Sequence, residues 1–334
     1  MIKANLIIYY LSYYAILKCI SGGSRLQTKD FLSVADLTIA EAEPLIKKAL
    51  KMKQKASPPL LAGKVVALLF EKPSLRTRVS FEVAIHQLGG YCLYLSPAEV
   101  GLGKREPVSD VARVLCRYVD GIIARTFSHQ TLITLAQYSS VPVINALSDL
   151  EHPCQALADI LTIYEKKGKL RGLDLAYVGD GNNVANSLLL AAAITGINVK
   201  IASPAGYEVD QQIVHKAREF AAQTGSQITM TSDPAQAVKD ADVVYTDVWT
   251  SMGQEAEAEQ RRLAFARYQV KPELLSLAKQ DVIFLHPLPA HHGEEVAAGL
   301  LDHTSSVVFD QAENRLHLQR ALLAEIFRKF GRTR

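Results

Sequence analysis

Short apolar runs alternate with segments of helical periodicity from residue 64 to the end of the chain. Between the runs, apolar residues recur at helical spacing, as in Phe81–Leu88 and Leu157–Tyr164. This alternation predicts an α/β fold with parallel sheets. The runs that predict buried strands are 64–70 (KVVALLF), 91–95, 121–124, 142–146, 173–178, 199–202, 243–246 and 282–285.

The length of the chain and one polar break predict its domain organisation. The chain has 334 residues, which suggests two domains at about 150 residues each. The polar, glycine-containing segment Lys166–Gly172 (KKGKLRG) predicts the boundary. We expect two lobes, each a parallel sheet flanked by helices, with the active site in the cleft between them. The expected extents are 28–165 for the first lobe, 166–311 for the second, and 312–334 for a last helix that packs back on the first.

The N-terminal segment differs from the rest of the chain. Residues 4–20 are nearly all apolar and are flanked by Lys3 and by Ser21–Ser24 (SGGS), an arrangement similar to a signal peptide. We expect residues 1–27 to be an extension, or the product of a mis-set start codon, ahead of a domain that begins near Thr28. An export signal is the alternative. The apolar stretch is short for a membrane span and contains several tyrosines, so we expect no membrane association.

The cysteine content predicts the cellular compartment, and the net charge limits the classes of partner that the chain can bind. The four cysteines stand at positions 19, 92, 116 and 154 without a CxxC pair, which predicts free thiols in a reducing compartment, here the cytoplasm. The net charge is +3, from 37 basic and 34 acidic residues. So small an excess predicts no nucleic-acid partner, although it is compatible with one local basic pocket for an anion.

The segment Glu71–Arg78 (EKPSLRTR) lies between a predicted strand and a predicted helix. At such a junction the backbone N–H groups and the positive end of the helix point at one spot, which favours a phosphate group. Ser74 and Thr77 add hydroxyl donors, and Arg76 adds a guanidinium that can bind two oxygens at once. The segment therefore predicts a phosphate site. The alternative is a helix cap with solvated arginines.

Two His-Pro pairs supply candidate groups for binding a carbonyl compound. His152 stands at a predicted helix N-terminus, where a neutral imidazole can donate to a carbonyl oxygen, and Gln155 offers an amide in the same turn. A plain turn is the alternative. In His286–Ala290 (HPLPA), two prolines leave the carbonyls of Pro287 and Leu288 free to accept from a ligand amide.

The histidines that follow this second pair could suggest a metal site. They are His291 and His292. No carboxylate or cysteine cluster near them has ligand spacing, so we expect no metal.

Two further loops follow predicted strands of the second half. The turn 178–183 (VGDGNN) is similar to a dinucleotide-binding turn, but its third glycine position holds Val184 and no acid ends the next strand, which disfavours an NAD-dependent dehydrogenase. Asn183 can still face the cleft. In Thr246–Gly253 (TDVWTSMG), Asp247 offers a carboxylate to an ammonium group and Ser251 a hydroxyl, on a loop that could close over a substrate. The alternative is a capped loop with a buried tryptophan.

In this order, the motifs resemble those of the aspartate/ornithine carbamoyltransferase family, over residues 28–334. The shared motifs are S-x-R-T-R at 74–78, H-P-x-Q at 152–155, D-x-x-x-S-M-G at 247–253 and H-x-L-P at 286–289. The loop 247–255 and the segment Gln311–Arg315 (QAENR) are similar to the ornithine branch of that family.

The resemblance implies a role for each motif. The residues implied to bind carbamoyl phosphate are Ser74, Leu75, Arg76, Thr77, Arg125, His152, Gln155, Pro287, Leu288 and Arg315. Those implied to bind ornithine are Asn183, Asp247, Ser251 and, through its backbone, Met252. The implied catalytic residues are Arg76, Thr77, His152 and Asp247.

The implied reaction is carbamoyl transfer from carbamoyl phosphate to the δ-amine of L-ornithine, which gives L-citrulline and phosphate in arginine metabolism. It requires neither a metal nor an organic cofactor. The alternatives are a carbamoyltransferase that acts on another amine and a catalytically inert homologue that binds carbamoyl phosphate. The family's catalytic unit is a trimer, so we expect a homotrimer or a multiple of trimers.

Two positions depart from the family's pattern. Pro287 stands where the ornithine branch usually has a cysteine, so a thiol contact with the incoming amine is lost. Gly101 stands in the loop 96–106 where the family usually has a Gln or His that reaches a neighbouring subunit's site. Lys104 and Arg105 are the candidates to replace that contact.

Overall fold

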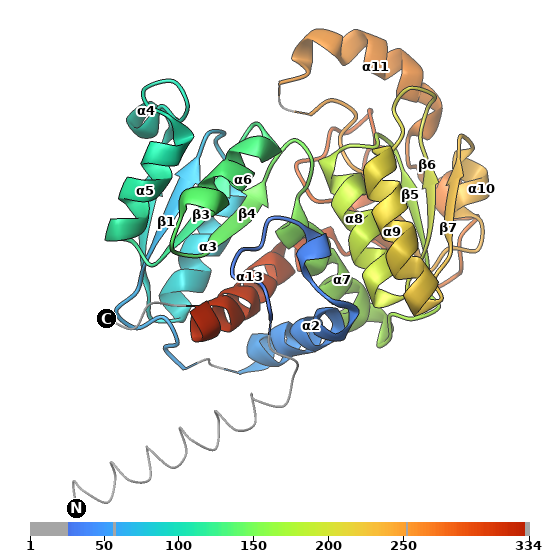
Figure 1. Cartoon of the computed structure of the whole chain (residues 1–334). Coiled ribbons are helices and arrows are strands. Elements are labelled where there is room, and N and C mark those ends of the chain that lie inside the picture. The colour runs from blue at the N-terminus through green and yellow to red at the C-terminus, as the bar shows by residue number, and fades with distance from the viewer. Residues whose placement is uncertain (1–25, 56–57, 252, 331–334) are drawn as a thin grey trace, which may run out of the picture.

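The chain forms two α/β lobes side by side, each built on a parallel sheet (Figure 1). The structure is a computed structural model, and it describes residues 26–55, 58–251 and 253–330. The strand order is β2-β1-β3-β4 in the first sheet and β7-β6-β5-β8-β9 in the second. All pairings between neighbouring strands are parallel. The predicted fold class is confirmed.

The first lobe is a sheet of four strands covered by helices on both faces. Its central strands are buried because they are continuous apolar runs, as predicted. The strands are β1 (Val65–Phe70), β2 (Tyr91–Leu95), β3 (Gly121–Arg125) and β4 (Val143–Leu147). The helices are α3 (Leu75–Gln87), α4 (Pro97–Val100), α5 (Val108–Tyr118) and α6 (His129–Tyr138).

The second lobe repeats this plan with five strands. The strands are β5 (Asp174–Val178), β6 (Asn198–Ala202), β7 (Ile228–Thr231), β8 (Val243–Tyr245) and β9 (Ile283–Leu285). The helices are α8 (Asn183–Thr195), α9 (Gln211–Thr224), α10 (Pro234–Val238), α11 (Ala258–Phe265) and α12 (Pro272–Leu275). Strand β7 was not predicted: it is a partly exposed edge strand with two threonines, so it forms no apolar run.

Three long helices join the lobes along one side of the molecule (Figure 1). They are α2 (Ile39–Gln54), α7 (Pro153–Lys167) and α13 (Val308–Phe330). Helix α13 packs against α2, α3 and α7, and α7 packs against α8 of the second lobe. A single apolar cluster therefore runs through both lobes, with Ile46, Leu161, Leu189 and Leu322 among its members. In the described part of the chain, no helix is both long and apolar enough to cross a membrane.

The two glycines of the turn after β5 serve chain packing. Gly179 has φ +145°, in the region that favours glycine. A Cβ on Gly181 would lie 2.3 Å from the backbone nitrogen of Val209, and the N–H of Gly181 donates to the carbonyl of Tyr207 at 2.8 Å. The G-x-G pattern is explained by this close crossing of two backbone segments.

The described chain is packed onto the body from Leu26, two residues before the expected start of the first lobe. The Leu26 side chain is only 2% exposed and belongs to the main apolar cluster. The Gln27 N–H donates to Glu41 at 2.6 Å, and Lys329 donates to the Leu26 carbonyl at 3.0 Å. The remainder of the expected extension, residues 1–25, lies outside the described residues.

Removal of residues 1–27 should therefore cost more stability than removal of residues 1–25. The longer deletion removes the buried Leu26 side chain, whose burial contributes about 2 kcal/mol. We expect the chain that starts at Thr28 to melt several degrees lower than the one that starts at Leu26, measured by differential scanning calorimetry. Equal melting temperatures would show that Leu26 contributes nothing to the core.

The backbone crossing at Gly181 makes a second prediction. Gly181→Ala should lower the free energy of unfolding by about 3 kcal/mol, because the new methyl group must displace backbone and not a flexible side chain. Gly206→Ala is the control: its φ of +85° is strained for alanine, but the space around it is open, so the cost should be about 1 kcal/mol. Urea unfolding of both variants gives the comparison, and equal costs would contradict the proposed clash.

Candidate active site

The sequence-predicted site residues gather around one cavity of about 350 Å³ between the lobes. Parallel strands place their carboxyl ends at one edge of each sheet, and the loops that follow β1, β4, β5, β8 and β9 converge there, together with Arg125 at the end of β3. The cavity is lined by Ser74, Leu75, Arg76, Thr77, Arg125, His152, Gln155, Asn183, Asp247, Ser251, Pro287, Leu288 and Arg315. Met252, the remaining predicted residue, lies outside the described residues.

The phosphate loop begins helix α3 at the cavity wall. Ser74 is the N-cap of α3, and its hydroxyl accepts a hydrogen bond from the Thr77 N–H at 3.2 Å. Thr77 is buried, so its hydroxyl belongs to the interior of the site. The Leu75 side chain is 75% exposed, and only its backbone can serve the cavity. The positive end of α3 thus adds to the arginines that surround it.

Three arginines line the cavity without a carboxylate to balance them. Arg125 and Arg315 are buried and Arg76 is half-buried. Arg315 donates to the Thr77 hydroxyl at 2.8 Å, and the Nε atoms of Arg125 and Arg315 have no hydrogen-bond partner. In residues 26–55, 58–251 and 253–330, no ion pair reaches any of the three.

The electrostatics of this cluster favour an anion. Burial, together with the charges of Arg315 and Arg76, lowers the pKa of Arg125 to about 10. Burial likewise lowers the pKa of Arg315 to about 10. Both guanidinium groups remain charged at neutral pH, so the cavity holds concentrated positive charge that a multiply charged anion would neutralise.

His152 is the N-cap of α7 and Gln155 lies in its first turn, and both line the same cavity. Burial, followed by the charges of Arg315 and Arg125, holds the pKa of His152 well below its usual range, so the imidazole is neutral at pH 7. Its Nδ1 atom has no partner. Gln155 donates its amide to Asp159 at 2.8 Å, which leaves the buried Oε1 atom without a partner. The pair offers a neutral imidazole and an amide oxygen to a ligand.

The second lobe contributes a buried carboxylate at the opposite wall. Asp247 follows β8 and accepts a hydrogen bond from Asn182 Nδ2 at 2.8 Å. Burial raises the pKa of Asp247, and the neighbouring His286 opposes that shift. Asn183, at the start of α8, donates to the Ser148 carbonyl at 2.6 Å and so connects the lobes. No cation pairs with Asp247 among the residues that the structure describes, which leaves it available to an ammonium group.

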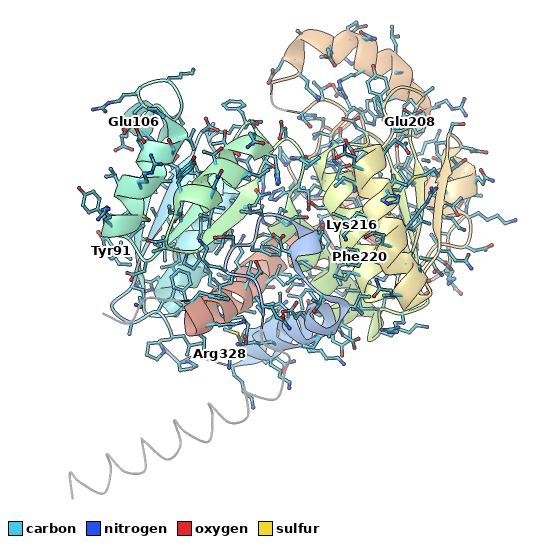
Figure 2. All side chains as sticks on the ribbon, in the orientation of Figure 1. Tyr91, Glu106, Glu208, Lys216, Phe220 and Arg328 are labelled. Carbon is cyan, nitrogen blue, oxygen red and sulfur yellow. The ribbon has the colours of Figure 1, made fainter. Side chains whose placement is uncertain are left out.

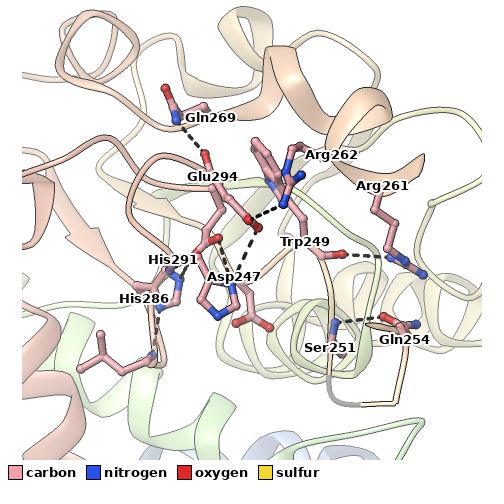
Figure 3. Close-up of polar contacts among 12 residues, drawn as sticks. Asp247, Trp249, Ser251, Gln254, Arg261, Arg262, Gln269, His286, His291 and Glu294 are labelled. Atoms are coloured by element: carbon pink, nitrogen blue, oxygen red, sulfur yellow. Dashed lines mark hydrogen bonds and ion pairs between the residues drawn. The ribbon is translucent and has the colours of Figure 1, made fainter. Parts of the chain in front are cut away.

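The loop after Asp247 carries Ser251 toward the cavity (Figure 3). The Ser251 N–H donates to Gln254 Oε1 at 3.0 Å, and Arg261 donates to the Trp249 carbonyl at 3.0 Å. Trp249 is buried and stacks on Phe265 with ring centroids 5.9 Å apart. The tryptophan therefore anchors the base of the loop, which was the structural alternative considered for it.

The His286 side chain holds the second His-Pro segment in place. Its Nδ1 atom accepts from the Leu288 N–H at 3.0 Å, so its Nε2 atom donates to Glu295 at 3.1 Å. Leu288 has φ +55°, a conformation that this bond helps to maintain. Within the described chain, neither the Pro287 nor the Leu288 carbonyl accepts a backbone hydrogen bond. Both carbonyls are available to a ligand.

The histidine pair after this segment has closer carboxylate neighbours than the sequence suggested. His291, Glu294 and Glu295 place one ligand atom each within 4.8 Å of one another, whereas the sequence had indicated no cluster with metal-ligand spacing. Both acids also have partners outside this group. Glu295 accepts from His286 and from the His291 N–H, and Glu294 accepts from Arg262 at 3.3 Å (Figure 3). His292 is exposed and is not part of this group.

Sequence reasoning assigned no role to Lys72, which also lines the cavity. Burial and the nearby charge of Arg125 lower the pKa of Lys72. Its ammonium group lies 4.4 Å from the centre of the Phe127 ring. The sequence feature that could have identified Lys72 is its position inside the phosphate-loop segment Glu71–Arg78.

Comparison with known proteins identifies the two lobes separately. The carbamoyl-phosphate-binding domain of the aspartate/ornithine carbamoyltransferases matches residues 29–165. The aspartate/ornithine-binding domain of the same family matches residues 171–326.

Individual relatives agree over nearly the whole chain. The ornithine carbamoyltransferase of Thermococcus kodakarensis is 56% identical over 89% of this chain and 95% of its own length. That of Bacillus subtilis is 53% identical over 90% of this chain and 94% of its own. The ornithine carbamoyltransferase structure from Pyrococcus furiosus superposes with a TM-score of 0.87 at 51% identity, covering 90% of this chain and 97% of that one. The chain belongs to the aspartate/ornithine carbamoyltransferase family.

Proposed function

We propose that the protein transfers the carbamoyl group of carbamoyl phosphate to the δ-amine of L-ornithine, forming L-citrulline and phosphate. The observation that carries this function is the cluster of three unbalanced arginines facing the buried Asp247 across one cavity. The arginines suit the phosphate group of an acyl phosphate, and the carboxylate suits the ammonium group of an amino acid. The relatives at 53–56% identity are named for the same reaction.

The phosphate end of carbamoyl phosphate is bound by the start of α3 and its arginines. Ser74 and the backbone of Leu75 donate to the phosphate oxygens, and Arg76 and Arg125 neutralise their charge. Thr77 accepts a hydrogen bond from Arg315, so its own hydroxyl hydrogen is free to point at the ligand. Arg315 thereby closes the site from the last helix.

The carbamoyl end has an NH₂ group that donates and an oxygen that accepts, and each meets protein groups of the opposite kind. Its NH₂ group donates to the carbonyls of Pro287 and Leu288 and to Gln155 Oε1, the acceptors that have no partner of their own. Its oxygen accepts from the neutral imidazole of His152, from Arg76 and from Thr77. These donors stabilise the negative charge that develops on that oxygen when the carbamoyl carbon becomes tetrahedral.

Ornithine is bound from the second lobe. Asp247 binds the α-ammonium group. The remaining polar atoms of the amino-acid head group are bound by Asn183 and Ser251 and by the backbone of Met252. The neutral δ-amine then attacks the carbamoyl carbon, a C–N bond forms, and the C–O bond to phosphate breaks. Alignment of the two substrates in one closed cleft supplies much of the acceleration.

Pro287 makes this site different from one with a cysteine at that position. Proline offers its carbonyl to the carbamoyl NH₂ but has no side-chain group that can accept a proton from the amine. The δ-amine must therefore lose its proton to solvent or to phosphate. The chemistry needs no metal or organic cofactor, because phosphate is already a good leaving group.

The role of each lobe follows from the binding residues that the lobe supplies. Residues 28–165 carry the phosphate loop, Arg125 and His152, and form the carbamoyl phosphate domain. Residues 166–311 carry Asn183 and Asp247, and form the ornithine domain. Helix α13 packs back on the first lobe and brings Arg315 to the cavity; it begins at Val308, four residues before the expected start at 312, and residues 331–334 lie outside the described part.

We also propose that the enzyme is a homotrimer or a multiple of trimers, assembled through the first lobe. The exposed face of α3 carries Leu75, Val79 and Val83, and the neighbouring edge strand β2 carries Tyr91 and Leu93. Tyr91 is 64% exposed and points away from the body (Figure 2). An apolar surface beside an unpaired strand edge is typical of a protein interface.

Two further features concern the contact between subunits and the cellular compartment: the loop 96–106 and the cysteines. Gly101 ends helix α4 with φ +56°, a conformation that explains a glycine there, and Lys104 and Arg105 are exposed for contact with a neighbouring subunit. Cys92 and Cys154 are free thiols, which supports a cytoplasmic enzyme.

The catalytic proposal is tested at Arg76. Wild-type protein should form citrulline from carbamoyl phosphate and ornithine, and Arg76→Ala should lower kcat at least about 100-fold without changing the melting temperature. Arg218→Ala, an exposed arginine on α9, is the matched control and should keep full activity. Absence of citrulline with wild-type protein would refute the function, and near-normal kcat for Arg76→Ala would remove the phosphate loop from the mechanism.

The assembly is tested at the exposed edge strand. In sedimentation velocity the wild-type chain should sediment as a trimer or a multiple of it, and the double variant Tyr91→Asp with Leu93→Asp should dissociate, because charge on this face opposes its burial. Leu263→Asp, at a 74% exposed leucine of α11 in the other lobe, should leave the assembly intact. A monomeric wild type would rule out the trimer.

A further inference from the structure

A fully buried carboxylate stands behind the cavity wall without reaching the cavity. Asp159 lies one turn after Gln155 on α7 and is not exposed. It accepts three hydrogen bonds, from Gln155 Nε2 at 2.8 Å, Gln311 Nε2 at 2.8 Å and the Tyr245 hydroxyl at 2.9 Å. The three donors come from α7, α13 and β8, so this one group joins both lobes and the last helix.

Burial raises the pKa of Asp159 to about 7, and above that pH the ionised group can only accept, which orients the two glutamine amides. Each must turn its NH₂ toward Asp159 and its oxygen away. The Gln311 oxygen accepts from the His286 N–H at 2.9 Å, at the start of the segment that carries Pro287. The Gln155 oxygen has no partner and lies in the wall of the cavity.

The two amides differ in how firmly they are held. Gln311 is fixed at both ends, by Asp159 and by the His286 backbone. Gln155 is held only through its NH₂ group, so rotation of its amide by half a turn breaks one hydrogen bond, that to Asp159. The Asp159 carboxylate is therefore the group that decides which end of Gln155 faces the ligand.

We propose that Asp159 is a positioning and specificity-determining residue: it holds the Gln155 amide with its oxygen toward the cavity, so that the site selects a ligand NH₂ group. With the amide reversed, the Gln155 NH₂ would face the carbamoyl NH₂, and two donors would meet without an acceptor. The inference rests on the proposed binding of carbamoyl phosphate. It explains why a buried carboxylate is retained where it contacts no substrate.

The test compares two ligands that differ only at the group in question. Phosphonoacetamide carries the NH₂ of a carbamoyl group, and acetonylphosphonate carries a methyl group in its place. In Asp159→Leu the new side chain offers no acceptor to the three donors, so Gln155 is released. We expect the Kd of phosphonoacetamide, measured by isothermal titration calorimetry, to rise about tenfold or more, and that of acetonylphosphonate to stay within about twofold.

A double-mutant cycle separates positioning from a general structural effect. Gln155→Ala should weaken phosphonoacetamide by a similar factor, and Asp159→Leu should add almost nothing in that background. Asp242→Leu is the matched control: Asp242 is also a buried carboxylate that accepts from a backbone N–H and a lysine, but it lies at the opposite end of β8. It should change neither Kd. If Asp159→Leu does not fold, Asp159→Thr serves instead, since its hydroxyl can hold only part of the donor set.

The outcomes distinguish this inference from the function on which it rests. If the wild type forms no citrulline and binds neither ligand, the proposed function fails. If the wild type forms citrulline but the variant weakens both ligands equally, or neither, the role of Asp159 in selecting the NH₂ group is wrong.

Discussion

Positive charge held at the meeting point of the two lobes, without a carboxylate to balance it, is the constraint on which the structure depends. Arg76 comes from the start of α3, Arg125 from the end of β3 and Arg315 from the last helix. Three like charges in a partly buried cavity repel one another, and only a fold with a large core elsewhere can hold them together. The ligand anion relieves that repulsion, so substrate binding and stability are coupled.

The apolar core whose burial compensates for this repulsion runs through both lobes. Helices α2, α7 and α13 pack together beneath the cleft, and their apolar faces merge with the cluster that covers both sheets. Buried carboxylates also connect particular elements to one another by hydrogen bonds. Glu151 accepts from Ser33, the Val34 N–H and Ser187, and thereby ties the N-terminal segment to α8; burial raises its pKa to about 7. Asp159 does the same for α7, β8 and α13.

In their ionised form, these acceptor groups explain how a site made from five separate loops keeps a single arrangement. A carboxylate surrounded by donors determines the orientation of every amide and hydroxyl that it contacts, since each must present hydrogen to it. The unpartnered atoms that remain, such as Gln155 Oε1 and the Nδ1 atom of His152, are left for the substrate. Polar atoms that lack a partner thus mark the part of the network that the ligand completes.

The sequence alone determined the fold class, the strands that are continuous apolar runs, and the motifs at their carboxyl ends, because apolar periodicity and loop chemistry are local properties. It missed β7, whose edge position needs no apolar run, and the burial of Leu26, which depends on contact with the end of the chain. It gave no reason to single out Asp159, which contributes no recognisable pattern, and it assigned no role to Lys72, although that residue lies inside the phosphate-loop motif. Only the tertiary structure decided that the Asp159 carboxylate meets donors from three elements, and that Arg315 reaches Thr77 across 238 positions of the chain, because such contacts depend on how distant elements pack and leave no trace in local spacing.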